Sequence, residues 1–368
     1  MKATEELHQL GQSLWLDNIS RVILNDGTLE RYIRDFSVTG LTSNPTIFDQ
    51  AIKGSDLYDD AIRAEGAEGS SDEELFFEVA IDDLVRAADL FRPAHVASGG
   101  TDGWVSLEVS PRLANDTSGT VTAAVQLHAR AQRPNLFIKI PGTPEGVPAI
   151  EETIFRGVPV NVTLLFSVAQ YVAAAEAYWR GIERRIAAGL DARVESVASL
   201  FVSRWDVAVH DRVAPALRNR LGVAVARQTY RAYRDLLASP RWLTLAAAGA
   251  RPQRLLWAST GTKDPQASDT LYVEALAAPD TIDTIPEKTL AAFAEHGRVN
   301  GVMPVDGGDA AEVLAAFQRA GVEEAALAHQ LQQEGTMAFT KSWNDLLARV
   351  AAKRVLLAGD LRSTERAP

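Results

Sequence analysis

Eight short apolar segments alternate along the chain with longer amphipathic stretches, and this alternation restricts the fold more than any other feature. Each segment has the length and the β-branched or aromatic content of a buried strand. Repeated strand–helix alternation indicates a parallel sheet, and eight units favour an α/β fold of the (β/α)8 TIM-barrel type. The expected strands are Ser13–Leu16, Val38–Thr42, Trp104–Val109, Leu136–Ile140, Val158–Leu165, Val197–Val202, Arg254–Ser259 and Leu271–Leu276.

The connecting stretches predict a single barrel domain over residues 1–368 with two additions. A helical insertion is expected at 52–103, after the second strand, with a polar loop at 65–72 and a helix over Asp72–Leu90. A helical C-terminal extension is expected at 287–357. Among the barrel helices, the apolar spacing predicts Val168–Ala188, Val207–Leu221 and Val223–Leu237.

Charge and composition narrow the class of protein. A length of 368 residues fits one barrel with insertions, and a net charge of −11 argues against a nucleic-acid-binding protein. Anionic small substrates stay compatible with this charge, because a local Arg or Lys site is enough to bind them. No apolar run has the length of a membrane span, and the N-terminus lacks the apolar core of a signal peptide. We therefore expect a cytoplasmic monomer or homodimer without nucleic-acid or membrane partners.

Several kinds of site are absent from the sequence. The chain has no Cys, which excludes disulfides, thiolate metal ligands and a Cys nucleophile. Its six His are scattered without metal-ligand spacing, so no metal site is predicted. The turn around Gly261 lacks P-loop spacing, and no Gly-x-Gly-x-x-Gly occurs. The sequence therefore gives no sign of a cofactor.

Lys139 stands inside the apolar run Leu136–Pro141, at the expected end of the fourth strand. A lysine is rarely buried without a partner, and desolvation disfavours its charged form. A neutral amine is a nucleophile that forms Schiff bases with carbonyl compounds. The alternative is a structural lysine that reaches solvent or pairs with a carboxylate.

Other strand candidates also end in polar residues, where a (β/α)8 barrel builds its active site. Carboxylates come at the ends of the first and third strands and an amide follows the second. An amide and a hydroxyl share one face of the fifth strand, and hydroxyls occupy the sixth and seventh. Each has a structural alternative, such as a helix cap, an ion pair or a bond to the backbone. The residues are Asp17, Asn44, Glu108, Asn161, Thr163, Ser199 and Ser259.

Two cations follow the sixth and seventh strands. Arg204 ends the segment 199–204, and Lys263 lies in the Gly-bearing turn at 259–265. Loops after late barrel strands frequently bind phosphate, and Arg and Lys are its usual ligands. Solvent-facing cations are the alternative. Together with Lys139, the carboxylates and amides would suit Schiff-base chemistry on a polyhydroxy ketone, with carboxylates moving protons and amides orienting hydroxyls.

At this point the sequence resembles the transaldolases, in particular the longer bacterial branch of this class I aldolase-type barrel family. The resemblance runs from about Leu14 to Glu274. It rests on four motifs in the same order and register, of which the last is the most specific: 42–45 (TSNP), 106–110 (SLEVS), 138–141 (IKIP) and 161–167 (NVTLLFS). The resemblance implies transfer of a dihydroxyacetone unit between sugar phosphates in the pentose phosphate pathway, without a cofactor.

The resemblance also implies roles for individual residues. Lys139 would form the Schiff base, and Asp17 would act as general base and acid. Glu108 and Thr163 would hold the catalytic water. Substrate would be bound by Asn44, Asn161, Ser199, Ser259, Arg204 and Lys263.

Two stretches depart from the shorter relatives. Residues 199–204 read SLFVSR where many relatives have SPFVGR, and TGTK follows Ser259 where many have an Arg. The second phosphate role is therefore assigned to Lys263. Two other functions stay open: an aldolase that cleaves fructose 6-phosphate and releases dihydroxyacetone, and a sugar-phosphate-binding barrel without activity.

Overall fold

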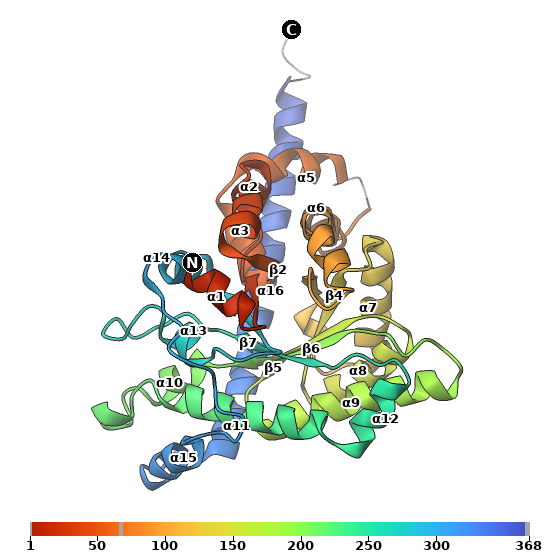
Figure 1. Cartoon of the computed structure of the whole chain (residues 1–368). Coiled ribbons are helices and arrows are strands. Elements are labelled where there is room, and N and C mark those ends of the chain that lie inside the picture. Colours follow the sequence, from red (N-terminus) through yellow and green to blue (C-terminus); the bar gives the residue numbers. More distant parts are fainter. Residues whose placement is uncertain (1, 66–68, 365–368) are drawn as a thin grey trace.

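The computed structural model describes residues 2–65 and 69–364 and contains a closed parallel barrel in which each strand pairs with the next (Figure 1). β8 closes the ring by pairing with β1. The strands are β1 Ser13–Leu16, β2 Val38–Thr42, β3 Val105–Glu108, β4 Leu136–Pro141, β5 Val160–Leu165, β6 Ser196–Phe201, β7 Arg254–Ala258 and β8 Ile282–Ile285. The predicted (β/α)8 barrel is confirmed.

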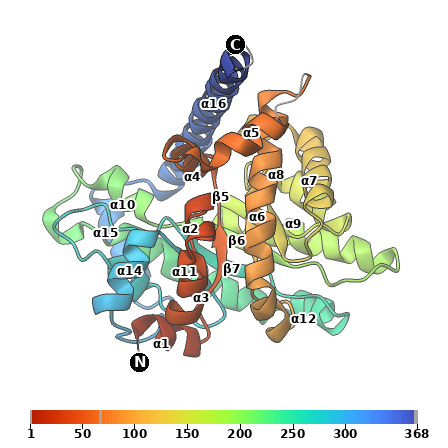
Figure 2. The ribbon, with the colours of Figure 1, turned by 90° about the horizontal axis from the view of Figure 1, so that it is seen from above.

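Helices surround the barrel and fill the longer connections (Figures 1 and 2). The α-helices are α1 Ala3–Gln9, α2 Arg21–Asn25, α3 Thr28–Phe36, α4 Pro45–Lys53, α5 Asp59–Glu65, α6 Asp72–Ala97, α7 Thr117–Ala131, α8 Gly146–Phe155, α9 Val168–Ala187, α10 Ser203–Val209, α11 Leu221–Leu237, α12 Pro240–Ala247, α13 Leu271–Ala275, α14 Glu287–His296, α15 Ala310–Arg319 and α16 Glu324–Thr364. Within the described residues, the 3-10 helices are η1 Asp56–Tyr58, η2 Pro111–Leu113 and η3 Pro215–Leu217. Residues 66–68 of the predicted polar loop lie outside the described residues.

An aromatic layer fills the barrel beneath its mouth. Trp15 of β1 and Phe137 of β4 have ring centroids 6.1 Å apart, and Trp104 stacks on Phe137 at 4.0 Å. Because β1 and β4 are not neighbours in the barrel, this contact passes through the interior. Gly40 of β2 permits it, since a Cβ there would lie 2.7 Å from the Trp15 indole nitrogen. Side chains two residues further along each strand point to the same interior, one layer higher.

The eighth strand was predicted in the wrong place. Residues 271–275 form the short helix α13, whose Glu274 accepts a hydrogen bond from the hydroxyl of Thr270 at 2.8 Å. The strand lies instead at Ile282–Ile285. A short apolar run does not distinguish a helix from a strand. The true strand was missed because it contains Asp283, a charged residue type that is rarely buried but is fully buried here.

The predicted helix Val207–Leu221 is also wrong. α10 ends at Val209, and Pro215 begins a 3-10 turn before α11 starts at Leu221. Asp206 accepts hydrogen bonds from the backbone N–H groups of Leu221 and Gly222 at 2.9 and 3.1 Å. These bonds satisfy the start of α11 and favour two separate helices over one continuous helix.

α16 is the longest helix and links distant parts of the chain. It packs against α4, α5 and α6 from the segment between β2 and β3, and its C-terminal end projects beyond the body (Figure 2). Trp343 packs edge-on against Phe76 of α6 at 5.1 Å. Among the described helices, none combines the length and the apolar character needed to span a membrane.

Asp283 gives a testable consequence of the fold. Its carboxylate is buried and accepts no hydrogen bond within the described structure, and the neighbouring Thr260 hydroxyl donates to the Thr284 carbonyl oxygen at 3.1 Å. Burial raises the pKa of Asp283 to about 7, whereas an unfolded Asp has a pKa near ~3.9. The folded chain thus holds a proton that the unfolded chain releases, so the free energy of unfolding falls as pH rises between these values.

In the wild type, this carboxyl should lower the free energy of unfolding by about 2–4 kcal/mol between pH 4 and 7.5, at ~1.4 kcal/mol per pKa unit. We expect Asp283→Asn to lose this part of the pH dependence. Urea denaturation across this pH range measures it. The exposed Asp235→Asn is the control and should keep the wild-type slope. Equal slopes for Asp283→Asn and wild type would contradict the assignment.

Candidate active site at the barrel mouth

A cavity of about 130 Å³ opens at the carboxyl ends of the strands. It is lined by Asp17, Thr42, Asn44, Lys139, Thr163, Ser199, Phe201, Arg204, Ala258, Ser259, Gly261, Lys263, Thr284, Pro286 and Phe339. Two residues predicted from the sequence, Glu108 and Asn161, do not line it but contact residues that do. The structure therefore brings all the sequence-predicted site residues together.

Strand register places the central groups side by side. Glu108 of β3 is level with Lys139 of β4, and Lys139 is level with Asn161 of β5. The apolar layer lies directly below, because Phe137 precedes Lys139 by two residues and Trp15 precedes Asp17 by two. The polar residues at the barrel mouth therefore lie directly above the aromatic layer.

Lys139 is buried, with only 6% of its surface exposed. Its Nζ donates a hydrogen bond to the Ser43 carbonyl oxygen at 3.0 Å and lies 3.4 Å from Glu108 Oε2. The alternative of a lysine reaching solvent is therefore excluded. The ion pair is present, but it leaves the amine at the cavity wall, where a ligand can reach it.

The two carboxylates lie in different surroundings. Burial raises the pKa of Glu108, opposed mainly by the charge of Lys139, and its Oε2 accepts no hydrogen bond within the described protein. Burial also raises the pKa of Asp17, opposed by Lys139 and by a hydrogen bond from Thr42 at 3.0 Å. Carboxyls with raised pKa values exchange protons more readily near neutral pH than ordinary ones do.

Asp17 and Asn44, which each follow a strand, could both have been helix caps, but only Asn44 is one. Asp17 does not cap α2, the described helix that follows it, because Ser20 caps that helix and accepts a hydrogen bond from the Ile23 N–H. Asn44 does cap α4, because its Oδ1 accepts a hydrogen bond from the Ile47 N–H at 3.1 Å. Asn44 also lines the cavity, so the cap fixes its side chain at the mouth.

The remaining polar groups lie in the cavity wall or bond to residues there. Ser199 donates to Asn161 Oδ1 at 2.7 Å, and Asn161 Nδ2 donates to Ser106 Oγ at 3.2 Å. Ser259 bonds Ser203 at 2.9 Å. Thr163 Oγ1 is buried and makes no hydrogen bond within the described residues, which leaves it available to a ligand.

Arg204 and Lys263 bring positive charge to the rim. The Arg204 guanidinium carbon lies over two aromatic rings, 4.9 Å from the ring centroid of Phe201 and 5.8 Å from that of Phe339. It makes no hydrogen bond or ion pair within the described part of the chain, and burial lowers its pKa against the opposing charge of Glu108 and Glu334. An unpaired guanidinium beside a cavity suits a bidentate anion. Lys263 is exposed at the same rim.

Sequence reasoning missed several lining residues. Thr284 lies on the misplaced eighth strand, and its hydroxyl is 2.6 Å from that of Thr42. Phe339 belongs to α16, and nothing in its local sequence places it over the barrel. Phe201 precedes Arg204 in a segment already singled out, and its inward direction follows from its spacing of two residues from Ser199.

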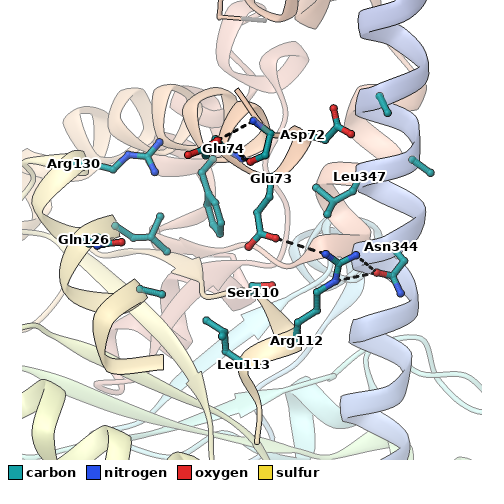
Figure 3. A pocket seen from close by; sticks show the side chains of 16 residues that line it. Asp72, Glu73, Glu74, Ser110, Arg112, Leu113, Gln126, Arg130, Asn344 and Leu347 are labelled. Atoms are coloured by element: carbon teal, nitrogen blue, oxygen red, sulfur yellow. Dashed lines mark hydrogen bonds and ion pairs between the residues drawn. The ribbon is translucent and has the colours of Figure 1, made fainter. Parts of the chain in front are cut away.

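A larger hollow of about 670 Å³ lies between α6, α7 and α16, away from these groups (Figure 3). Its charged side chains already have partners: Arg112 reaches Asn344 at 2.6 Å and Glu73 at 3.8 Å, and Glu74 completes the capping box of α6. No lysine lines it. The barrel mouth, although smaller, is therefore the candidate active site. Among the described residues, no group of three His, Asp or Glu is placed to hold a metal ion.

Comparison with known proteins agrees with this geometry. The family model described as transaldolase/fructose-6-phosphate aldolase matches residues 14–350. The chain belongs to this family. Relatives named transaldolase include one from Thiobacillus denitrificans, 46% identical over 95% of this chain and 100% of that protein. Another, from Thermobifida fusca, is 46% identical over 94% of this chain and 97% of that protein.

Among solved structures, the catalytic domain of a chitinase from Pyrococcus furiosus matches at 10% identity and a TM-score of 0.32, over 78% of this chain and 95% of that one. This similarity is too low to carry an argument about fold or function. The family assignment rests on the sequence matches.

We expect Thr42→Val to raise the pKa of Asp17 further, because the change removes a hydrogen bond that favours the carboxylate. The carboxyl carbon resonance of Asp17, followed by NMR across a pH titration, measures the shift. Thr122→Val is the control, since the Thr122 hydroxyl bonds only the Ser118 carbonyl on the exposed face of α7. An unchanged or lowered Asp17 pKa in Thr42→Val would contradict the assignment.

Proposed function

We propose that the protein is a transaldolase of the pentose phosphate pathway. It transfers a dihydroxyacetone unit from sedoheptulose 7-phosphate or fructose 6-phosphate to glyceraldehyde 3-phosphate or erythrose 4-phosphate. The observation that carries the proposal is a buried lysine at a barrel mouth, placed 3.4 Å from one carboxylate and sharing its cavity with a second carboxylate and an unpaired guanidinium. The names of the relatives support it.

The first step is attack of the Lys139 amine on the ketose carbonyl carbon. The carbinolamine that forms must lose water to give the imine. Glu108, with its raised pKa, supplies and takes back the protons of this dehydration. The free hydroxyl of Thr163 holds the departing water next to Glu108.

The second step breaks a carbon–carbon bond. Asp17 removes the proton from the hydroxyl beside that bond, the aldose phosphate leaves, and the enamine of dihydroxyacetone stays on Lys139. The same steps in reverse join the enamine to the acceptor aldehyde. Lys139 is regenerated by hydrolysis of the product imine.

The other polar residues bind substrate. Asn44, Asn161, Ser199 and Ser259 contact the hydroxyls of the dihydroxyacetone unit, which amides and hydroxyls orient without adding charge. Arg204 and Lys263 bind the phosphate at the rim. We also propose that the enzyme is cytoplasmic and acts as a monomer or homodimer.

A second candidate is an aldolase that cleaves fructose 6-phosphate and releases free dihydroxyacetone. The description of the family includes both activities. Incubation with fructose 6-phosphate, with and without erythrose 4-phosphate, separates them. Glyceraldehyde 3-phosphate that forms only with the acceptor supports the transaldolase, equal product without it supports the aldolase, and no product supports a binding protein.

Lys139→Ala should abolish turnover, because the only other lysine that lines the cavity, Lys263, is exposed at the rim and is not paired with Glu108. In the wild type, borohydride added with fructose 6-phosphate should attach the substrate to Lys139, as mass spectrometry of peptides detects. Lys341→Ala, a change at an exposed lysine of α16, should leave both readouts intact. Full activity of Lys139→Ala would overturn the mechanism.

Arg204→Ala should lower kcat/KM for phosphorylated donors by about one to two orders of magnitude, the effect of losing a charged hydrogen bond. Dihydroxyacetone transfer from unphosphorylated fructose should change far less. Steady-state kinetics with both donors measures the difference. Equal losses for both donors would show that Arg204 does not bind the phosphate.

A further inference from the structure

The segment of α16 from Gln332 to Phe339 closes one side of the candidate active site. Gln332 Nε2 donates hydrogen bonds to the carbonyl oxygens of Gly142 and Leu164, at 2.9 and 3.0 Å. Gly142 directly follows β4, which carries Lys139, and Leu164 is the residue after Thr163 near the end of β5. The helix is thus bonded to the rim of the barrel.

Close approach of the helix depends on Gly335. A Cβ at this position would lie 2.9 Å from Leu164 Cδ2 and 3.1 Å from an Arg204 guanidinium nitrogen. Any other residue would require these neighbours to move. One helical turn beyond this segment, Trp343 packs against Phe76 and Phe77 of α6 and holds the helix in place.

Phe339 lies one helical turn from Gly335 and faces the same cavity. Its ring centroid is 6.0 Å from Lys139 Nζ and 5.8 Å from the Arg204 guanidinium carbon. Only 7% of its surface is exposed. An apolar ring in this position occupies space that water would otherwise fill beside the reactive amine.

We propose that Phe339 determines how often the enamine on Lys139 is lost to water instead of being transferred. The inference rests on the proposed function. Loss to water begins when the enamine carbon takes a proton, which converts the enamine to an iminium ion. Water then adds to the iminium carbon, and free dihydroxyacetone leaves while the Lys139 amine is restored. The ring limits the entry of the water and of the proton that this sequence needs.

The test measures both fates of the enamine in Phe339→Ala. With fructose 6-phosphate as donor, free dihydroxyacetone is compared with sedoheptulose 7-phosphate formed from erythrose 4-phosphate. Both products come from one intermediate, so their ratio does not depend on how tightly the donor binds. We expect the ratio of release to transfer to rise by about tenfold, a change produced by a small difference between two barriers.

Two further variants make the result specific. Met337→Ala changes an apolar residue of the same helix that is 63% exposed, and it should keep the wild-type ratio. Phe339→Leu retains most of the apolar volume and should give an intermediate ratio. It also serves as the test variant if Phe339→Ala does not fold. An unchanged ratio in the folded Phe339 variants would overturn the proposal.

A second measurement does not require turnover. Reductive methylation of Lys139 by formaldehyde and a borane, followed by peptide mass spectrometry, reports how readily small polar reagents reach the amine. The rate should rise several-fold in Phe339→Ala and stay unchanged in Met337→Ala. If the wild type shows no acceptor-dependent transfer, the transaldolase proposal fails, and equal methylation rates would overturn the role of Phe339 independently.

Discussion

The contact between Lys139 and Glu108 is the interaction on which the rest of the site depends. Two opposite charges are held 3.4 Å apart with almost no exposure to solvent. Such burial is costly, and only a rigid frame keeps both groups in place. The parallel register of β3 and β4 supplies that frame, because it sets the two residues level on neighbouring strands. The aromatic layer of Trp15, Phe137 and Trp104 fills the barrel interior below them, which leaves both side chains at the mouth.

The surroundings of this pair differ from those of a purely structural ion pair. The Lys139 amine has one backbone acceptor, the Ser43 carbonyl, and Glu108 Oε2 and Thr163 Oγ1 have no hydrogen-bond partner among the described residues. A purely structural ion pair would be expected to have its remaining donors and acceptors satisfied. Thr163 and the unpaired guanidinium of Arg204 line one small cavity with Lys139, and Glu108 adjoins it through its ion pair with Lys139.

Much of this arrangement could be predicted from the sequence, since seven strands lie within two residues of their expected positions. The eighth could not, because Asp283 interrupts its apolar run while the more apolar 271–275 folds as a helix. The predicted helix Val207–Leu221 was wrong because apolar spacing does not reveal the turn at Pro215. Nor does it reveal that the Asp206 side chain accepts hydrogen bonds from the start of α11. We propose that the chain is one barrel domain with additions at 52–103 and 287–357, and this division stays a prediction.

The sequence by itself determined the barrel and most of the polar residues at its mouth. Strand periodicity fixes which side chains point inward, and the ends of parallel strands must meet at one edge. Only the tertiary structure decided which of these groups are unpaired and what covers them. Phe339, Gly335 and Gln332 reach the site from a helix that begins far beyond the last strand. Their place depends on how α16 packs across the rim, which no local pattern encodes.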